Sequence, residues 1–282
     1  RMRKAITGGG FCLEGGGFGE AATAIMTTDT FAKAASTEID IEGHTVRIAG
    51  MAKGAGMIHP NMATMLGFVM TDAMVSSAAL QEAVHTAAGL SFNMISVDGD
   101  TSTNDMLLAL ANGASGAPLI DSIGSREGGA FSSALADVCR TLAVMIAKDG
   151  EGATKLIEVH VEGAACDLEA RRIARSVTGS NLVKAAFFGE DANWGRVLAA
   201  MGYSGASFDP ERVSISFVSR GSEVSLMEHG TPVEFDEELA AKVLAEPEIT
   251  VEIGLGDGSC EATAWGCDLT YDYVKINGDY RT

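Results

Sequence analysis

The chain has 282 residues, of which 46% are hydrophobic and 21% charged, and its formal net charge at pH 7 is −18. This composition is typical of a soluble globular protein, and the length fits one large domain or two smaller ones. The acidic balance argues against binding to nucleic acid, because phosphate-backbone contacts require clustered Lys and Arg. No apolar run approaches the ~20 residues that span a bilayer, so we expect no membrane partner.

The five cysteines and five histidines form no recognisable metal or disulfide pattern. There is no CxxC pair and no HExxH spacing. We therefore expect no metal site, no disulfide framework and a reducing, cytoplasmic setting. The acidic loop 98–105 lacks the ligand spacing of an EF-hand, and its polar side chains are expected to line a site or to bond loop backbone. These side chains are Asp98, Thr103, Asn104 and Asp105.

Hydrophobic periodicity and turn residues predict the elements of the N-terminal half. In chain order they are a short helix and loop within 1–19, a short helix over 20–25, a hairpin over 36–49 around Glu42-Gly43, a turn over 53–57, a buried strand over 65–70, a helix over 76–88, a strand over 92–97, the polar loop 98–105, a strand over 106–110 and a long helix over 131–147. Lys148 in the last turn and Gly150 just beyond it suit the end of that helix.

The same reasoning predicts the elements of the C-terminal half. They are a strand over 154–163, a helix over 167–177, a strand over 182–188, a helix over 191–201, a hairpin of 213–218 with 223–227, a helix over 236–244, strands over 249–255 and 260–270, and then a tail. Strands and helices alternate irregularly, neighbouring strands look hairpin-connected, and no segment repeats. This pattern favours a layered α+β fold over a parallel α/β barrel.

One stretch, Met51–Phe68 (MAKGAGMIHPNMATMLGF), places a hydroxyl group at a loop-to-strand junction. Thr64 is open to two interpretations. It is either the β-branched first residue of a strand, or a nucleophile. A threonine hydroxyl needs an adjacent base, and its own α-amino group can serve once the chain is cut before it. The second interpretation requires cleavage between Ala63 and Thr64.

The run from Met51 to Leu66 resembles the self-cleavage motif of the ornithine acetyltransferase family, also called glutamate N-acetyltransferase. Three further stretches resemble the same family in the same order. They are 24–30 (AIMTTDT), 150–155 (GEGATK) and 272–282 (DYVKINGDYRT). The similarity extends from about residue 20 to residue 282. It implies two central sheets flanked by helices, an α-β-β-α sandwich like that of the N-terminal-nucleophile hydrolases but with the family's own topology.

The resemblance implies a two-stage chemistry at Thr64. Thr64 Oγ first attacks the Ala63 carbonyl, and hydrolysis leaves an alpha fragment, 1–63, and a beta fragment, 64–282, which form one catalytic unit. Thr64 then carries an acetyl group from N2-acetylornithine to glutamate, a step of arginine biosynthesis, with no metal or organic cofactor. Acetyl-CoA is a further candidate donor. The family also suggests a heterotetramer of two alpha and two beta fragments.

Five other residues match family positions that contact substrate. They are Thr27, Lys53, Glu151, Asn277 and Thr282. A carboxylate at Glu151 suits a substrate ammonium group, and charge matching assigns Lys53 to a substrate carboxylate. Asn277 and Thr282 stand close to the chain end, so their role implies that the tail folds back over the pocket.

The chain departs from the family pattern at its N-terminus. In the family a Thr-Gly pair that stabilises the oxyanion lies in a segment upstream of the part matched here, and we expect that segment to be missing from this chain, which starts at Arg1. Thr7-Gly8 has the right residue types but stands too close to the Thr27 cluster to take that role. Two alternatives stay open: an N-terminal-nucleophile aminopeptidase or amidase with water as the acceptor, or an inactive truncated member.

Overall fold

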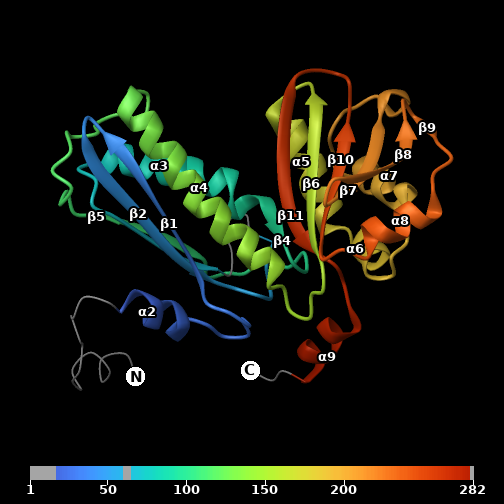
Figure 1. Cartoon of the computed structure of the whole chain (residues 1–282), viewed down its shortest axis with the longest axis horizontal. Coiled ribbons are helices and arrows are strands. Elements are labelled where there is room, and N and C mark those ends of the chain that lie inside the picture. The colour runs from blue at the N-terminus through green and yellow to red at the C-terminus, as the bar shows by residue number, and fades with distance from the viewer. Residues whose placement is uncertain (1–16, 60–64, 280–282) are drawn as a thin grey trace.

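The computed structural model describes residues 17–59 and 65–279. Within them the chain forms two β-sheets with helices packed against them (Figure 1), which confirms the predicted α+β class. The first sheet has four strands in the order β1-β2-β3-β5, and the second has seven in the order β4-β11-β6-β10-β7-β8-β9.

The first sheet is built from the N-terminal segments. Its strands are β1 (Lys33–Ile41), β2 (His44–Lys53), β3 (Leu66–Thr71) and β5 (Met106–Ala111). The predicted hairpin joins β1 to β2 through Glu42 and Gly43, both at positive φ, as a tight two-residue hairpin turn requires. β3 pairs antiparallel with β2 and parallel with β5. The register sets Lys53 opposite Leu66, so the end of β2 lies beside the start of β3.

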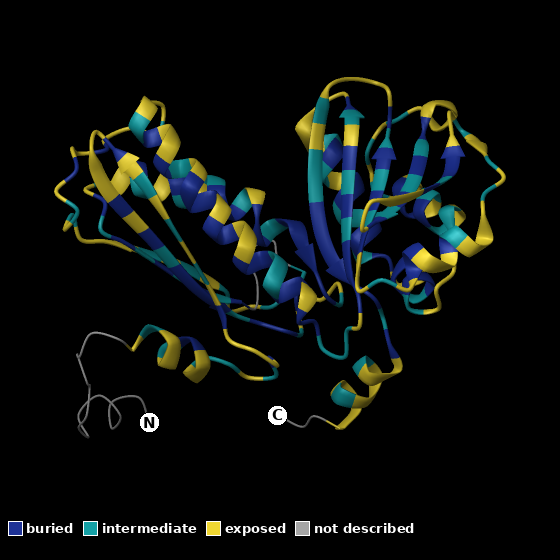
Figure 2. Cartoon of the chain, in the orientation of Figure 1, coloured by how far each residue is buried: buried dark blue, intermediate teal, exposed yellow. Residues whose placement is uncertain are grey.

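Two long helices cover the first sheet, α3 (Ser77–Leu90) and α4 (Arg126–Lys148). Each begins after a serine whose hydroxyl accepts a backbone N–H of the first turn. α4 packs on α3, β1 and β2 and also meets β4 and β11, so it joins the two sheets. α4 has the length and apolar composition of a membrane span, but its apolar stripe lies in the protein core (Figure 2).

The second sheet holds the C-terminal segments and has mixed strand directions. Its strands are β4 (Ile95–Ser96), β6 (Leu156–Ala164), β7 (Ser214–Ser219), β8 (Ser222–Glu228), β9 (Thr231–Pro232), β10 (Glu248–Gly254) and β11 (Cys260–Cys267). β6 pairs parallel with β10 and antiparallel with β11. Helix α5 (Asp167–Gly179) packs on β6 and β11, while α8 (Glu237–Leu244) packs on β7 and β8.

The predicted strand over 182–188 is wrong, because this segment is helix α6 (Asn181–Phe188). The Ser180 hydroxyl accepts the Val183 N–H and caps the helix. Val183 and Lys184 are buried together with Ala186 and Phe187, the i, i+1, i+3, i+4 spacing of a helical face. A short apolar run cannot be assigned to strand or helix from periodicity alone.

Other elements also differ from the prediction in their bounds or form. The expected strand over 92–97 is a 3₁₀ turn (Phe92–Met94) followed by the two-residue strand β4. The helix expected from 191 begins later, as α7 (Trp194–Gly202), because the Asn193 side chain caps it. The expected tail forms helix α9 (Tyr271–Asp279). The helix expected over 20–25 is α2 (Phe18–Ala24), and the one expected within 1–19 lies largely outside the described residues.

Candidate functional site

The end of β2 and the turn before β1 meet through a lysine and a threonine. Lys53 Nζ lies 3.5 Å from Thr27 Oγ1 and donates to it. Thr27 is exposed, and Lys53 is half-buried at the last position of β2. Two of the residues that the sequence singled out are therefore in contact, although they are 26 positions apart.

This turn is held in place by a buried ion cluster of Lys33, Asp29 and Asp149, called the Lys33 cluster from here on. Lys33 Nζ lies 2.6 Å from Asp29 Oδ1 and 2.5 Å from Asp149 Oδ2, and the three side chains are between 0% and 3% exposed. Buried charges persist only when they are paired and hydrogen-bonded. The cluster therefore joins the start of β1 to the end of α4, which comes 116 residues later in the sequence.

Asp29 also fixes the backbone on both sides of the Thr27–Lys53 contact. Its carboxylate accepts the Thr27 N–H at 3.0 Å and the Gly54 N–H at 2.7 Å. Burial raises the pKa of Asp29, but the hydrogen bonds from Gly54, Lys33 and Thr27 outweigh it and hold that pKa below its ordinary value. Asp29 therefore stays ionised at neutral pH.

Glu151 lies against the turn that leaves β2. Its backbone N–H donates to the Ala55 carbonyl at 2.8 Å, and its carboxylate Oε2 accepts from Asn277 Nδ2 at 2.8 Å. Gly56 is required for this approach, because a Cβ there would stand 2.6 Å from Glu151 Oε1. Asn277 belongs to α9, so the expected return of the C-terminal segment toward Glu151 is present in the structure.

Helix α9 buries none of its residues and is fastened by polar contacts near its start. Tyr273 O–H donates to Asp98 Oδ2 at 3.3 Å, and burial together with Asp98 raises the pKa of this phenol. Asp98 also accepts the Met57 and Ile58 N–H groups at 2.6 and 2.9 Å, as expected of a residue that bonds loop backbone. α9 and the segment after β2 are thus connected through one carboxylate.

Asp105 is a half-buried carboxylate beside the same segment. Neither of its oxygens has a hydrogen-bond partner of good geometry among the described residues. Burial raises its pKa, while the neighbouring Met65 N–H and Lys53 lower it. An unsatisfied buried carboxylate is costly, because burial removes the water that would otherwise hydrogen-bond its oxygens. The neighbouring Thr103 and Asn104 are exposed and bond to each other.

Thr27, Lys53, Glu151 and Asn277 therefore converge from four separated segments. Ala63, Thr64 and Thr282 lie outside the described residues. Met65, which follows Thr64 in the sequence, is buried, and its carbonyl accepts the Met106 N–H at 3.0 Å. In the described part of the chain no group of three His, Cys, Asp or Glu side chains could hold a metal ion.

Sequence reasoning missed the Lys33 cluster and Tyr273. Lys33 stands at the first position of a strand whose other residues alternate in burial. From sequence alone, a lysine at such a position is expected to be exposed to solvent. The only local signal was Asp29, four residues earlier, and the second carboxylate is far away in the sequence.

Comparisons with known proteins address the family directly. The sequence profile of the ArgJ family matches residues 2–282. A relative from Symbiobacterium thermophilum is 61% identical over 282 residues, which are all of this chain and 69% of that protein. One from Caldanaerobacter subterraneus is 54% identical over 95% of this chain and 66% of that protein. Both carry the name arginine biosynthesis bifunctional protein ArgJ, and this chain spans about two thirds of their length.

A solved structure agrees with the sequence relatives. The crystal structure of the arginine biosynthesis bifunctional protein argJ from Bacillus halodurans aligns with a TM-score of 0.71 at 42% identity, over 76% of this chain and 98% of that one. The resemblance noted in the sequence is thus confirmed at the level of the family. The chain belongs to the ArgJ family.

Proposed function

We propose that this chain takes part in arginine biosynthesis as a glutamate N-acetyltransferase that moves acetyl from N2-acetylornithine to glutamate. The observation that carries the proposal is that Lys53 begins the turn 53–56 and that Glu151 packs against Ala55 and Gly56 of the same turn. Lys53 contacts Thr27, and Glu151 is bonded to Ala55 and Asn277. Donor and acceptor are both amino acids, so a cation and a carboxylate that belong to or contact the same turn match their opposite charges.

The positioning roles follow from these contacts. Lys53, with the Thr27 hydroxyl beside it, binds a substrate carboxylate. Glu151 accepts from the substrate ammonium group, and Asn277 orients the Glu151 carboxylate from α9. Thr282, three residues beyond the described part of α9, adds a hydroxyl from the same segment.

The nucleophile of the proposal is Thr64, released by cleavage of the Ala63–Thr64 bond. The new α-amino group has an unperturbed pKa of about 7.7–8.0. The Lys53 cation lies on the strand paired with the one that follows Thr64, and a nearby cation lowers the pKa of an amine toward the neutral, basic form.

The acetyl transfer balances through one ester intermediate. Thr64 Oγ attacks the acetyl carbonyl of N2-acetylornithine, the amide C–N bond breaks, and the hydroxyl proton passes through the α-amino group to the departing ornithine amine. The glutamate amine then attacks the acetyl-threonine ester, the C–O bond breaks, and Oγ takes up a proton again. Neither half-reaction needs a metal or an organic cofactor.

The remaining parts of the proposal concern the whole protein. The alpha fragment, 1–63, and the beta fragment, 64–282, form one catalytic unit and assemble as two copies of each in the cytoplasm. Acetyl-CoA is a second donor, in keeping with the word bifunctional in the names of the relatives. One relative, from Schizosaccharomyces japonicus, is named as mitochondrial.

The test is the intact mass of the purified chain beside Thr64→Ala and Thr64→Ser. We expect two masses, for residues 1–63 and 64–282, in the wild type and in Thr64→Ser, which keeps a hydroxyl, and one uncut mass in Thr64→Ala. A single uncut mass in the wild type and in both variants would contradict the threonine mechanism. Acetylornithine turnover with and without glutamate then separates a transferase from an amidase, because only an amidase works at full rate with water alone.

A further inference from the structure

The segment 57–59, which follows the turn 53–56, is held by the loop 96–101 through its backbone. The Ile58 carbonyl accepts the Val97 N–H at 2.6 Å, and the His59 carbonyl accepts the Thr101 hydroxyl at 2.9 Å. The Ile58 side chain is fully buried. Segment 57–59 therefore has a fixed path, and only residues 60–62 stand between it and the Ala63–Thr64 bond in the sequence.

Asp98 makes the central contacts of this arrangement. Its Oδ2 accepts the Met57 N–H at 2.6 Å, and its Oδ1 accepts the Ile58 N–H at 2.9 Å. Hydrogen bonds to an ionised acceptor are roughly twice as strong as neutral ones. The Asp100 N–H also donates to Oδ1, at 3.2 Å, and Tyr273 O–H donates to Oδ2, at 3.3 Å. One oriented carboxylate thus binds two successive N–H groups of the segment.

Met57 has a backbone conformation that needs such support. Its φ is +55°, in the left-handed region that a residue with a Cβ adopts only at a cost. Its side chain is 50% exposed, so packing of that side chain does little to hold the conformation. Strained backbone of this kind persists where the surroundings fix it, and it gathers at functional sites. The two hydrogen bonds from 57 and 58 to Asp98 fix it here.

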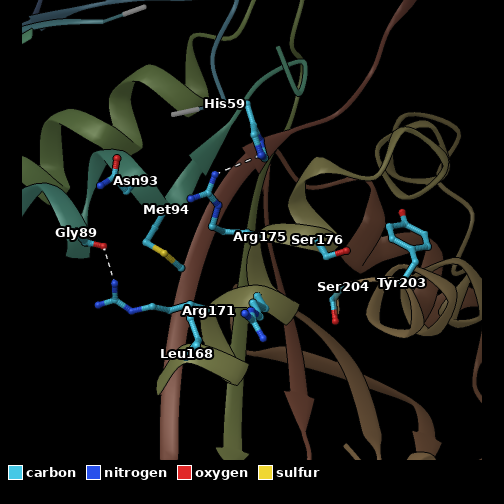
Figure 3. A pocket seen from close by; sticks show the side chains of 11 residues that line it. His59, Gly89, Asn93, Met94, Leu168, Arg171, Arg175, Ser176, Tyr203 and Ser204 are labelled. Carbon is cyan, nitrogen blue, oxygen red and sulfur yellow. Dashed lines mark hydrogen bonds between the residues drawn. The ribbon is translucent and has the colours of Figure 1, made fainter. Parts of the chain in front are cut away.

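The side chain of His59 also fastens the segment. Its Nδ1 lies 3.0 Å from Ser96 Oγ. Its Nε2 lies 3.2 Å from Nη2 of Arg175, a residue of α5 that lines a cavity of about 490 Å³ together with Arg171 and Arg172 (Figure 3). Burial and the nearby Arg175 lower the pKa of His59, so the neutral ring accepts from Arg175 and donates to Ser96. Segment 57–59 is thus attached both to the loop 96–101 and to helix α5.

The chain that follows residues 60–64 is fixed as well. Met65 is buried, and its carbonyl accepts the Met106 N–H at 3.0 Å. Leu66 begins β3, which pairs with both β2 and β5. The connection that contains the proposed scissile bond therefore starts and ends at fixed points. Holding the reacting groups near their reactive geometry is a main source of rate in an intramolecular reaction, and small displacements are costly.

We propose that Asp98 and Thr101 are positioning residues for cleavage of the Ala63–Thr64 bond, because they hold the segment that leads to it. This inference rests on the proposed function. In the cleavage step Thr64 Oγ adds to the Ala63 carbonyl carbon, and the C–N bond breaks as the hydroxyl proton passes to the nitrogen. Water then hydrolyses the ester, which leaves a carboxylate on Ala63 and the free hydroxyl on Thr64. Asp98 and Thr101 exchange no bond in either step and act through the backbone of 57–59.

The test is the rate of self-cleavage during cell-free synthesis of the full chain, followed by intact mass. Asp98→Asn keeps the shape of the side chain but removes its charge and turns an amide NH2 toward one of the two N–H groups. We expect it to slow cleavage by about 10–100-fold. Asp236→Asn is the matched control and should leave the rate unchanged. Asp236 also accepts two backbone N–H groups, those of Glu238 and Leu239 at 2.9 and 3.1 Å, but at the start of α8.

A second pair of variants removes a single hydroxyl. Thr101→Val deletes the donor to the His59 carbonyl at an exposed position, where the fold tolerates the change. We expect cleavage to slow by about 3–10-fold, the effect of one lost hydrogen bond. Thr141→Val is the matched control, because it deletes an exposed hydroxyl of α4 that donates to the Asp137 carbonyl, also at 2.9 Å. It should leave the rate unchanged.

A glycine at position 57 separates positioning from overall stability. Glycine adopts the left-handed conformation of Met57 without a steric cost, so Met57→Gly should recover most of the cleavage rate lost in Asp98→Asn. His229→Gly relieves another left-handed residue, with a φ of +45° between β8 and β9, and should recover none of that rate. Unfolding midpoints of the same variants, measured with Thr64→Ala added, check that all the chains are folded.

The outcomes distinguish this inference from the proposed function. A wild-type chain that stays uncut refutes the proposed cleavage, and the inference with it. If the wild type is cut while Asp98→Asn and Thr101→Val are cut as fast as their controls, the inference alone is overturned. Recovery by His229→Gly as large as that by Met57→Gly would also overturn it, since the defect would then be one of overall stability.

Discussion

Replacing Lys33 by methionine tests the view that the Lys33 cluster organises the site. Methionine keeps the length and apolar stem of the side chain and removes only the ammonium group. Asp29 and Asp149 would then face each other without the cation that now lies 2.6 and 2.5 Å from them. Because both carboxylates are almost fully buried, water cannot replace the lost partner.

The size of the effect follows from this burial. Removing one partner of a buried ion pair costs about 3–5 kcal/mol, because the other charge is left uncompensated. With an unfolding entropy of about 2.1 cal/mol/K per residue, a chain of this length loses roughly 5–8 °C of Tm for that change. We therefore expect Lys33→Met to lower the free energy of unfolding, measured by urea titration at pH 7, by about 3–5 kcal/mol.

A second lysine provides the matched control. Lys148 Nζ lies 2.6 Å from Glu248 Oε1, but these side chains are 51% and 58% exposed. An exposed pair contributes only about 0–1 kcal/mol, so Lys148→Met should change the midpoint little. A loss below about 1 kcal/mol in Lys33→Met, or equal losses in both variants, would refute the reasoning from burial.

The Lys33 cluster also predicts a pH dependence with a definite sign. Asp29 has a folded pKa below its ordinary value, so its contribution to stability is present above about pH 4 and is lost as the pH falls through that lower pKa. In Lys33→Met, Asp29 loses the Lys33 cation that helps to lower its pKa, so its carboxylate takes up a proton at a higher pH than in the wild type. The difference between wild type and variant should therefore narrow between pH 7 and pH 4, and a constant difference would contradict the assignment.

Two further predictions rest on single positions. Gly56→Ala is expected to displace the Glu151 carboxylate at little cost in stability, because the flexible Glu151 side chain can move. The lost charge-assisted hydrogen bond should lower kcat/KM for acetylornithine by roughly 10–100-fold. Gly202→Ala, with open space around it, is the control, and equal kinetics in the two variants would argue against the role of Glu151. Burial raises the pKa of the Cys139 thiol to about 12. Iodoacetamide at pH 8 should therefore label the exposed Cys166 and leave Cys139 unmodified in the native protein, as measured by peptide mass spectrometry. Labelling of Cys139 before unfolding would contradict this expectation.

Local patterns predicted the elements that depend on neighbouring residues. The β1–β2 hairpin follows from alternation on both sides of Glu42-Gly43, and α4 from its apolar stripe. Local patterns failed where the conformation of a short segment depends on contacts with residues distant in the sequence. Helix α6 has an apolar sequence whose Lys184 is buried and bonded to the carbonyls of Val97 and Cys267, partners that no local pattern reveals.

The same limit applies to the candidate site: sequence identified residues within motifs, but not their contacts with residues distant in the chain. Resemblance to the family motifs singled out Thr27, Lys53, Glu151 and Asn277. The structure joins them as two contacting pairs, Lys53 with Thr27 and Glu151 with Asn277, that meet at the turn after β2. The resemblance could not reveal the carboxylates that hold them, because Asp149 and its lysine are 116 residues apart. Nor could the spacing of three arginines in 171–175 show that they face a cavity rather than solvent, since an amphipathic helix predicts only that its polar side lies away from the core.

The pairing of β2 with β3 has a consequence for the protein after a cut in the loop between them. Six residue pairs, from Ile48 with Thr71 to Lys53 with Leu66, hydrogen-bond two strands that would then belong to different chains. In the uncut chain the pairing closes only a short loop, which carries a small entropic cost. Once the loop is cut, unfolding is also dissociation, and the two pieces gain translational freedom. The stability of the mature protein then depends on its concentration, and a protein that folds readily as a precursor refolds slowly from separated fragments.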